Sequence, residues 1–415
     1  IERLAEEGWL EGDIRPGPRW ADKQVHLARA YEGFKVRAGE AVRQAFEEFV
    51  SDNAHWLPDF SLYRVIKAEH QGRPWSEWGK AERDRDPAAL RRVQQRHAED
   101  LERIRFEQFV FHRQWLDLKQ HANGQDIRIF GDLPIFVAHD SADVWAQRDY
   151  FLLDEDGQPT VVAGVPPDYF SQTGQRWGNP HYDWERMQAD GFRWWQERLQ
   201  RQLELFDLVR IDHFRGFEAY WEVPAEEETA MNGRWVEAPG DELFEVLHER
   251  FDPLPIVAED LGTISAEVRA LRRKYALPGM KILQFAFDSD AKNPYLPHNH
   301  RRNSVAYTGT HDNDTTLGWY EGLAEETRAR VLEYLGHPQE DPPWPVIRAA
   351  YASVARLAVV PLQDVLVLGS EQRMNRPGTT EGNWGWRFAW DQVPGDLAGR
   401  LHEMMALYGR AHRRR

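Results

Sequence analysis

The stretch that decides the fold is Leu-Val-Arg-Ile-Asp-His-Phe-Arg-Gly at positions 208–216. A strand has a side-chain period of two, so a strand here places Arg210 and Asp212 on one face and Val209 and Ile211 on the other. A cation beside a carboxyl lowers its pKa by about 1–3 units. We therefore expect Asp212 to be ionised at neutral pH and able to act as a nucleophile. A structural ion pair at a strand end is the alternative interpretation.

Further apolar runs follow the same pattern outward from this stretch. Together with 208–211 they predict six strands after residue 125, the others being 126–137, 255–260, 280–287, 304–310 and 357–362. Helical patterns separate these runs and polar residues stand at their carboxyl ends, which favours parallel β/α units closed into a (β/α)8 TIM barrel with helical insertions. A barrel needs eight strands, so we expect the first two to lie in sequence absent from this chain. The rival is an open doubly wound sheet, but no glycine-rich phosphate loop of the GxGxxG or Walker type is present.

The remaining chain predicts two further features. Residues 1–124 read as a helical insertion subdomain, with Phe111, Trp115 and Leu118 at helical spacing, and residues 125–415 read as the remainder of the catalytic barrel. A loop insertion is expected at 151–190, where residues 166–180 are too rich in Gly and Pro for regular structure. Loops of this length in a compact domain are usually functional.

Composition excludes several classes of partner. The net charge of -16 repels phosphate backbones and anionic lipid, so we expect neither nucleic acid nor membrane as a partner. The chain has no cysteine, which excludes disulfides, thiolate metal sites and cysteine nucleophiles and fits a cytoplasmic location. Its 18 Trp residues include flat rings of the kind that stack on sugars, although most Trp in a large protein fill the core.

Three acids are the first carboxylates after predicted strands: Asp212, Glu259 and Asp312. Strand ends meet at the mouth of a barrel, and a pair of carboxyls, one nucleophile and one acid/base, is the equipment of retaining glycosidases. Glu259 follows apolar residues without an adjacent cation, so we expect a raised pKa and the role of proton donor. Asp312, with His311 beside it, would hold sugar hydroxyls. Each acid taken alone could instead satisfy loop amides or helix N-termini.

A metal site is the main alternative use of these acids. Asp, Glu and His at a barrel mouth also bind divalent cations. Against this, no HExxH spacing is present, and Arg210 would place a positive charge beside any ion at Asp212. We predict no metal and no cofactor.

Several segments together carry a family resemblance. Residues 210–216, Ala-Glu-Asp-Leu-Gly at 258–262 and Gly-Thr-His-Asp-Asn-Asp-Thr-Thr at 309–316 resemble the signatures of the amylomaltase, or 4-α-glucanotransferase, family (glycoside hydrolase family 77) of the α-amylase clan. Similarity extends from about residue 1 to 410. Further matching segments are 131–135, 140–145, 164–180, 296–299 and 382–387.

The resemblance implies a role for each site residue. It makes Asp212 the nucleophile, Glu259 the general acid/base and Asp312 the stabiliser of the transition state. The substrate-binding residues that it implies are Arg210, His213, Asp260 and His311 at the donor subsite, Asn383 across the cleft, and Tyr169, Gln175 and Trp177 on a loop at the acceptor side.

The resemblance also implies the reaction. It is the transfer of α-1,4-glucan segments from a donor maltooligosaccharide to the 4-hydroxyl of an acceptor glucan or glucose by retaining double displacement. The acids alone leave open whether sugar or water is the acceptor, because that depends on how well the site excludes water. An α-1,4-glucan hydrolase of the same clan and a catalytically inactive glucan-binding protein are therefore the alternatives.

Overall fold

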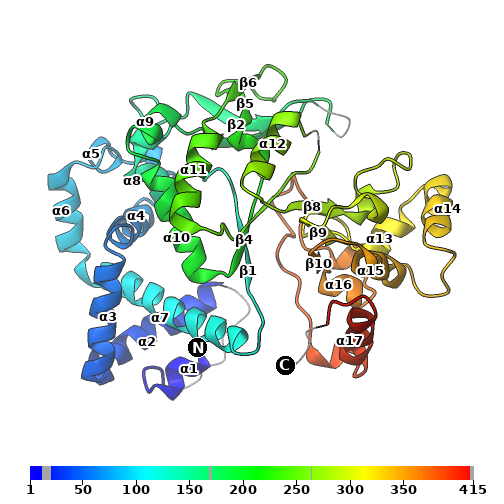
Figure 1. The fold of residues 1–415 in the computed structure, drawn as a ribbon. Coiled ribbons are helices and arrows are strands. Elements are labelled where there is room, and N and C mark those ends of the chain that lie inside the picture. The colour runs from blue at the N-terminus through cyan, green and yellow to red at the C-terminus, as the bar shows by residue number, and fades with distance from the viewer. Residues whose placement is uncertain (12–19, 168–170, 263, 412–415) are drawn as a thin grey trace. The chain divides into compact units, whose positions relative to one another are not determined.

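The computed structural model describes residues 1–415 apart from 12–19, 168–170, 263 and 412–415 (Figure 1). None of the helices in the described residues combines the length and the apolar composition that crossing a membrane requires.

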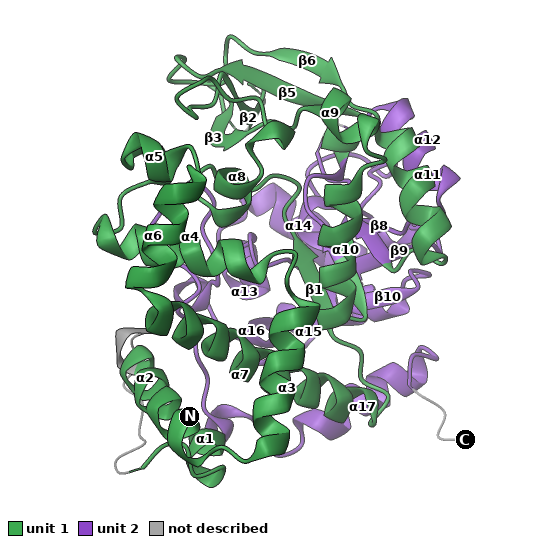
Figure 2. Cartoon of the chain, turned by 90° about the vertical axis from the view of Figure 1, so that its left-hand side faces the viewer, with its two compact units in different colours: residues 1–209, 215–255 green, residues 210–214, 256–415 purple. Residues whose placement is uncertain are grey.

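The chain forms two compact units, coloured separately in Figure 2. Unit 1 contains Ile1–Val209 and Arg215–Pro255, and unit 2 contains Arg210–Phe214 and Ile256–Arg415. The division falls within strand β4, Leu208–Ile211. The boundary that we expected at 124/125 stays a prediction.

The first part of unit 1 is helical, as the apolar spacing predicts. Its core is largely aromatic, with Trp9, Phe34, Phe46, Phe106 and Phe109 buried in one cluster. Rings of this size bury a large apolar area each, which stabilises the packing of these helices against one another. The helices are α1 Glu2–Glu6, α2 Trp20–Arg37, α3 Glu40–Asp52, α4 Leu57–Glu69, α5 Lys80–Arg83, α6 Pro87–Arg96 and α7 Ala98–Asn123.

The stripe on α7 forms the expected helix but does not face the core along its length. Phe111 and Leu118 are 48% and 53% exposed, whereas Phe106 and Phe109 are buried. The Trp115 side chain is partly buried, and its indole N–H donates to the carbonyl of Leu205 at 2.8 Å.

The remainder of unit 1 alternates strands and helices. Its elements are β1 Phe130–Leu133, α8 Ala142–Ala146, β2 Val161–Val165, β3 Gln175–Pro180, α9 Trp184–Ala189, α10 Arg193–Leu205, the first half of β4, β5 Ala219–Pro224, β6 Arg234–Glu237 and α11 Gly240–Phe251.

This part of unit 1 contains a sheet that the sequence did not predict, formed by two strands of the expected insertion and two strands that follow β4. Strands β3, β2, β5 and β6 form a four-stranded antiparallel sheet in that order. The prediction of no regular structure at 166–180 is wrong for Gln175–Pro180, which pairs with β2 from Val165↔Gln175 onward. Backbone pairing does not depend on β-forming side chains. Gly174 and Gly178, at φ +66° and +80°, supply the left-handed conformations that the turn and the irregular register require.

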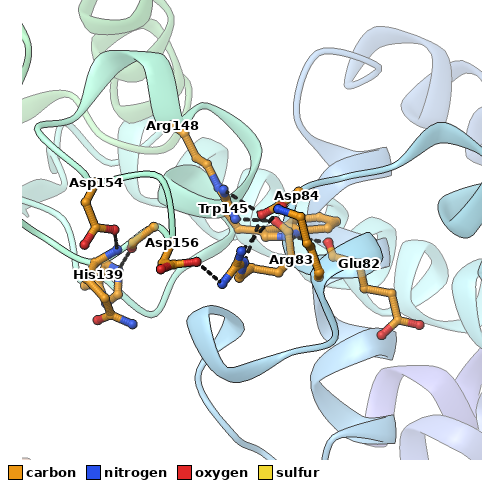
Figure 3. A network of polar contacts seen from close by, with 11 residues as sticks. Glu82, Arg83, Asp84, His139, Trp145, Arg148, Asp154 and Asp156 are labelled. Carbon is orange, nitrogen blue, oxygen red and sulfur yellow. Dashed lines mark hydrogen bonds and ion pairs between the residues drawn. The ribbon is translucent and has the colours of Figure 1, made fainter.

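Polar contacts fasten a loop of the insertion to the helical part within unit 1 (Figure 3). The Arg83 guanidinium contacts Asp156 at 2.9 Å and Asp84 at 2.9 Å, and Arg148 contacts Asp84 at 3.2 Å. The indole of Trp145 donates to the carbonyl of Glu82 at 3.1 Å. The cations next to Asp84 lower the pKa of its carboxyl well below the usual range.

The parallel sheet has six strands in the order β1-β4-β7-β8-β9-β10. All six strands were predicted, and the α/β class is confirmed. Figure 1 shows β8, β9 and β10 side by side in unit 2, and their registers pair Met280 with Val305 and Val305 with Leu357. Strand β8 is shorter than expected, because a 3-10 helix at Leu283–Phe285 follows it directly. The described residues place six strands in this sheet, so two of the eight strands of a closed barrel are not among them.

Unit 2 supplies the other elements of this sheet and its helices. They are the second half of β4, β7 Ile256–Ala258, α12 Ala266–Lys274, β8 Gly279–Ile282, β9 Ser304–Tyr307, α13 Thr316–Glu321, α14 Glu325–Tyr334, α15 Pro343–Ala352, β10 Leu357–Val359, α16 Leu362–Val365 and α17 Leu397–Leu407.

Candidate active site

The three predicted acids all belong to unit 2 and follow strands of one parallel sheet. Asp212 comes directly after β4, Glu259 directly after β7, and Asp312 five residues after the end of β9. Strands β4 and β7 are neighbours, and the Glu259 amide donates to the carbonyl of Ile211 at 3.0 Å. The carboxyl ends of parallel strands meet at one edge of the sheet, which is where catalytic residues gather in barrels.

Asp212 forms the predicted ion pair. An Nη2 hydrogen of Arg210 is donated to Asp212 Oδ1 at 2.7 Å, and the Arg210 side chain is only 10% exposed while that of Asp212 is 44% exposed. A mostly buried cation thus holds a carboxylate whose other oxygen is open to a ligand. The next residue, His213, has φ +49°, a left-handed conformation that turns the chain sharply after the strand.

That turn connects the first acid to the second. The backbone N–H of His213 donates to Glu259 Oε2 at 2.6 Å, and the N–H of Phe214 donates to the carbonyl of Glu259 at 3.2 Å. Although Glu259 keeps some exposed surface, burial of its carboxyl raises its pKa, and the charge of Asp212 raises it further. Arg210 and the His213 N–H act in the opposite direction, and the pKa of Glu259 is about 7. A carboxylic acid with this pKa is partly protonated at neutral pH and can serve as both acid and base.

The buried Glu259 carboxyl has a consequence for stability. A folded-state pKa of about 7, against a usual 4.5, means that the folded protein holds this proton more tightly than the unfolded chain does. The tighter proton binding adds to the free energy of unfolding at low pH. This added stability, up to roughly 3 kcal/mol, is lost as the pH rises towards 7. Glutamine does not titrate, so the stability of Glu259→Gln relative to that of the unmodified chain should be greater at pH 8 than at pH 5. Urea unfolding of both proteins at the two pH values measures this gain, and an equal difference at both would contradict the buried acid.

Asp312 is held by residues on both sides of it in the chain. Asn375 Nδ2 donates to Asp312 Oδ1 at 2.6 Å, His311 Nε2 lies 3.4 Å from Oδ2, and Arg373 Nη2 donates to the backbone carbonyl of Asp312 at 2.5 Å. Burial alone would raise the pKa of Asp312. The hydrogen bond and charge of His311, together with the Asn375 amide, outweigh burial and hold that pKa below its usual value. Asp312 is therefore a fixed negative charge at neutral pH.

Two of these partners were missed from the sequence. Asn375 and Arg373 lie after α16, more than sixty residues beyond Asp312, in a segment without regular secondary structure. Trp384 was also not singled out by itself. Its ring lies 5.1 Å from the ring of His311, and its φ of +58° is unusual for a bulky residue. Backbone conformations of this kind cluster at functional sites, and His213, next to Asp212, has one as well.

Asn375 provides a test of the Asp312 site. Replacing it with Ala removes a hydrogen bond to a charged oxygen, an interaction of about 1.5–3 kcal/mol. If Asp312 stabilises a cationic transition state, we expect Asn375→Ala to lower kcat/KM for maltotriose by roughly 10- to 100-fold. The matched control is Asn232→Ala, which removes an amide hydrogen bond to Glu227 at an exposed position. Equal kinetics for both variants would count against a role for Asp312.

A cavity of about 280 Å³ lies within unit 2 beside this cluster. Its lining includes Arg210, His311 and Arg373, together with Tyr307 and Met374. Guanidinium and imidazole groups donate hydrogen bonds and aromatic rings offer flat faces, which suits the cavity to a polyhydroxylated ligand, although none of the three acids lines it.

The other predicted substrate-binding residues are not gathered at this cavity. The carboxylate of Asp260 contacts Arg272 Nε at 3.2 Å and accepts the Met280 N–H at 2.7 Å. Asn383 accepts the Arg376 N–H at 2.9 Å and donates to the Thr379 carbonyl at 3.1 Å. The roles of both at a subsite stay predictions.

The predicted acceptor loop belongs to the other unit. Gln175 and Trp177 lie on β3 in unit 1, where the Trp177 indole donates to Gln175 Oε1 at 3.2 Å. Tyr169 lies outside the described residues. The roles of these three residues stay predictions. In the described ranges, no group of three or more His, Asp or Glu side chains is placed to hold a metal ion.

The pKa of Glu259 sets an expected pH profile. If Glu259 is the general acid of the first chemical step, that step needs its protonated form, and kcat/KM for maltotriose should fall about tenfold per pH unit above an apparent pKa near 7. α-Maltosyl fluoride supplies a leaving group that needs no proton, so this alkaline limb should be absent from its kcat/KM. Initial rates from pH 5 to 9 at low substrate concentration measure both profiles. A limb shared by the two substrates would assign it to another group.

The chain is similar to known proteins in both sequence and structure. The sequence model of a family described as 4-alpha-glucanotransferase matches residues 6–392. The 4-alpha-glucanotransferase of Thermus thermophilus is 51% identical over 404 residues, covering 95% of this chain and 80% of that protein. The enzyme of the same description from Synechocystis is 49% identical over 426 residues, covering 99% of this chain and 84% of that protein.

Solved structures agree with this relationship. The amylomaltase from Streptococcus agalactiae in complex with acarbose superposes with a TM-score of 0.94 at 35% identity, covering 99% of this chain and 86% of that one. The amylomaltase from Corynebacterium glutamicum, at 19% identity and a TM-score of 0.72, shares the fold, covering 98% of this chain and 62% of that one. The predicted barrel class is confirmed by the first likeness. On sequence and structure together, the chain belongs to the 4-alpha-glucanotransferase family.

Proposed function

We propose that Asp212, Glu259 and Asp312 carry out the 4-alpha-glucanotransferase reaction on maltooligosaccharides as a retaining double displacement. The observation that carries this assignment is the Asp212–His213 turn, which presents a carboxylate paired with Arg210 and donates its own N–H to a carboxyl of pKa about 7. One group suited to nucleophilic attack and one suited to proton transfer are thus joined by a single turn of backbone.

In the first step, a carboxylate oxygen of Asp212 attacks the anomeric carbon of the donor. The bond from that carbon to the leaving 4-oxygen breaks while Glu259 gives this oxygen its proton. The product is a covalent glucosyl-enzyme and a shortened glucan. Positive charge develops on the sugar ring in the transition state, and the Asp312 carboxylate stabilises it.

In the second step, Glu259 removes the proton from the 4-hydroxyl of an acceptor sugar. That oxygen attacks the anomeric carbon, Asp212 leaves, and the configuration of the donor is retained. In this proposal His213, His311 and Arg210 donate hydrogen bonds to the sugar hydroxyls. The complex of the Streptococcus agalactiae relative with acarbose supports a ligand of this class.

Maltotriose tests the proposed function directly. Incubation followed by chromatography should give glucose and a ladder of maltooligosaccharides both shorter and longer than the donor. The same incubation in H2(18)O measures how much water enters new reducing ends, and transfer predicts little incorporation. Glucose and maltose alone, with label in the product whose reducing end is newly formed, would identify a hydrolase. No change in maltotriose, with retained binding, would identify an inactive glucan-binding protein.

Partners and location follow the sequence argument. We propose maltooligosaccharides and α-1,4-glucans as the physiological ligands and a cytoplasmic location. The family description supports the former, and the absence of cysteine supports the latter.

A further inference from the structure

A second cavity of unit 2 has a lining unlike the rest of the protein. It measures about 350 Å³ and lies between α12, the outward side of β8 and the segment 292–304. Its lining holds one carboxylate, that of Asp260. The cationic side chains that line it are Arg269, Arg272, Arg273, Lys281, Lys292 and Arg301. In a chain with a net charge of -16, this is a local reversal of sign.

At the inner end of the cavity, the cationic side chains of Arg272 and Lys281 outnumber the single carboxylate of Asp260. Arg272, whose side chain is 13% exposed, contacts Asp260 at 3.2 Å, and Asp260 also accepts the Met280 N–H at 2.7 Å. Lys281 lies largely buried beside them, with its ammonium 5.3 Å from the centre of the Tyr295 ring. Burial lowers the pKa of Lys281, and the neighbouring arginines lower it further, while Asp260 acts in the opposite direction. Two cationic side chains, Arg272 and Lys281, thus share the single carboxylate of Asp260 at the floor of the cavity.

The mouth adds further positive charge. Arg269, Arg273, Lys292 and Arg301 are exposed around it. Across the described residues, no carboxylate forms an ion pair with Lys292 or Arg301. Side chains of like charge repel one another, so holding these cations around one small cavity costs stability unless an anion occupies it.

The substrates of the family reaction do not explain this cavity. α-1,4-Glucans carry no charge, so they gain little from a lining of ammonium and guanidinium groups. The volume excludes a polymer from the interior but accommodates a small ion or a monosaccharide ester. Guanidinium pairs with phosphate oxygens through two parallel hydrogen bonds, and lysine adds a point charge.

We propose that the cavity lined by Arg272, Lys281, Lys292 and Arg301 binds a phosphate group, carried by inorganic phosphate or by a sugar phosphate. The anion lies between the floor cations and the rim, where it replaces the missing carboxylates. Binding occurs apart from the acids Asp212 and Asp312 and does not depend on turnover.

Calorimetric titration of the complete chain with sodium phosphate, at constant ionic strength set with KCl, tests this proposal. We expect saturable binding at one site with a Kd of about 1 mM or lower. A rise in melting temperature with phosphate concentration should accompany it, because a ligand that binds only the folded state stabilises that state. A titration without saturation up to roughly 20 mM would overturn the proposal.

Matched variants locate the site. Lys292→Gln combined with Arg301→Gln removes two exposed rim cations and should weaken phosphate binding at least tenfold. Arg302→Gln removes one positive charge, against two in the double variant, from the neighbouring exposed position, which does not line the cavity, and should leave the Kd within twofold. Equal losses in both proteins would show general charge attraction and overturn the proposal.

Glucose 1-phosphate separates the two sources of the phosphate group. Tighter binding than inorganic phosphate, lost in the double variant, would identify a sugar phosphate, and equal affinity would identify phosphate itself. Maltotriose transfer should be retained by the double variant. Failure of phosphate to bind would leave the transfer reaction intact, so the two proposals fail separately.

Discussion

Asp212→Asn is expected to lower the rate of maltotriose disproportionation by roughly 10⁴-fold, because the amide cannot form the covalent bond to the anomeric carbon. The amide oxygen can still accept the Arg210 hydrogen bond that now measures 2.7 Å, so the strand end keeps its shape. Initial rates from the chromatography of maltotriose products measure the loss. The matched control is Asp52→Asn at an exposed position of α3, which should keep full activity.

The identity of the nucleophile can be read from a product. In Asp212→Gly, azide can enter the space left by the carboxylate and attack α-maltosyl fluoride, forming a carbon–nitrogen bond as fluoride leaves. Attack from the Asp212 side inverts the anomeric centre, so NMR should show β-maltosyl azide. Activity of Asp212→Asn above a few per cent of the unmodified chain would refute the assignment.

Glu259→Gln is expected to lower the same disproportionation rate by about 10²- to 10⁴-fold, the usual contribution of general acid–base catalysis. Glutamine has the shape of the protonated acid and its oxygen can accept the His213 N–H, but it cannot transfer the proton. The matched control is Glu267→Gln, at an exposed position in the first turn of α12.

Glu259→Gln should also trap the intermediate. With α-maltosyl fluoride the first step needs no proton, whereas the second step lacks its base, so the maltosyl-enzyme should accumulate. Mass spectrometry of the intact protein should then show the added maltosyl group, and digestion should place it on the peptide that contains Asp212. A modified peptide without Asp212 would reassign the nucleophile, and unchanged turnover of maltotriose would remove Glu259 from the acid/base role.

These two variants separate two kinds of defect. Loss of the nucleophile abolishes both half-reactions, whereas loss of the acid/base spares the first step for an activated donor. The Asn375→Ala variant acts on charge stabilisation and should slow both steps for every donor. Three patterns of kinetics therefore distinguish the three proposed roles.

The sequence by itself determined the parallel sheet and the pairing of its first acid. Apolar runs of strand length separated by helical patterns predicted all six strands. The signal is strongest where a strand of a parallel sheet is buried on both faces, as β7 and β9 are, because such burial requires near-continuous apolar sequence. The period of two placed Arg210 beside Asp212, and the structure has that ion pair. Apolar neighbours of Glu259 predicted its raised pKa, because burial disfavours the charged carboxylate.

Only the tertiary structure decided which distant residues complete the site. Asn375 and Arg373 contact Asp312 because the chain returns after α16, and no local pattern encodes a contact across sixty residues of sequence. The four-stranded antiparallel sheet of unit 1 depends on backbone pairing between segments that look irregular alone. Asp260 follows Glu259 directly, yet it contacts Arg272 and β8 in a second cavity, because neighbouring residues at a strand end project to opposite sides.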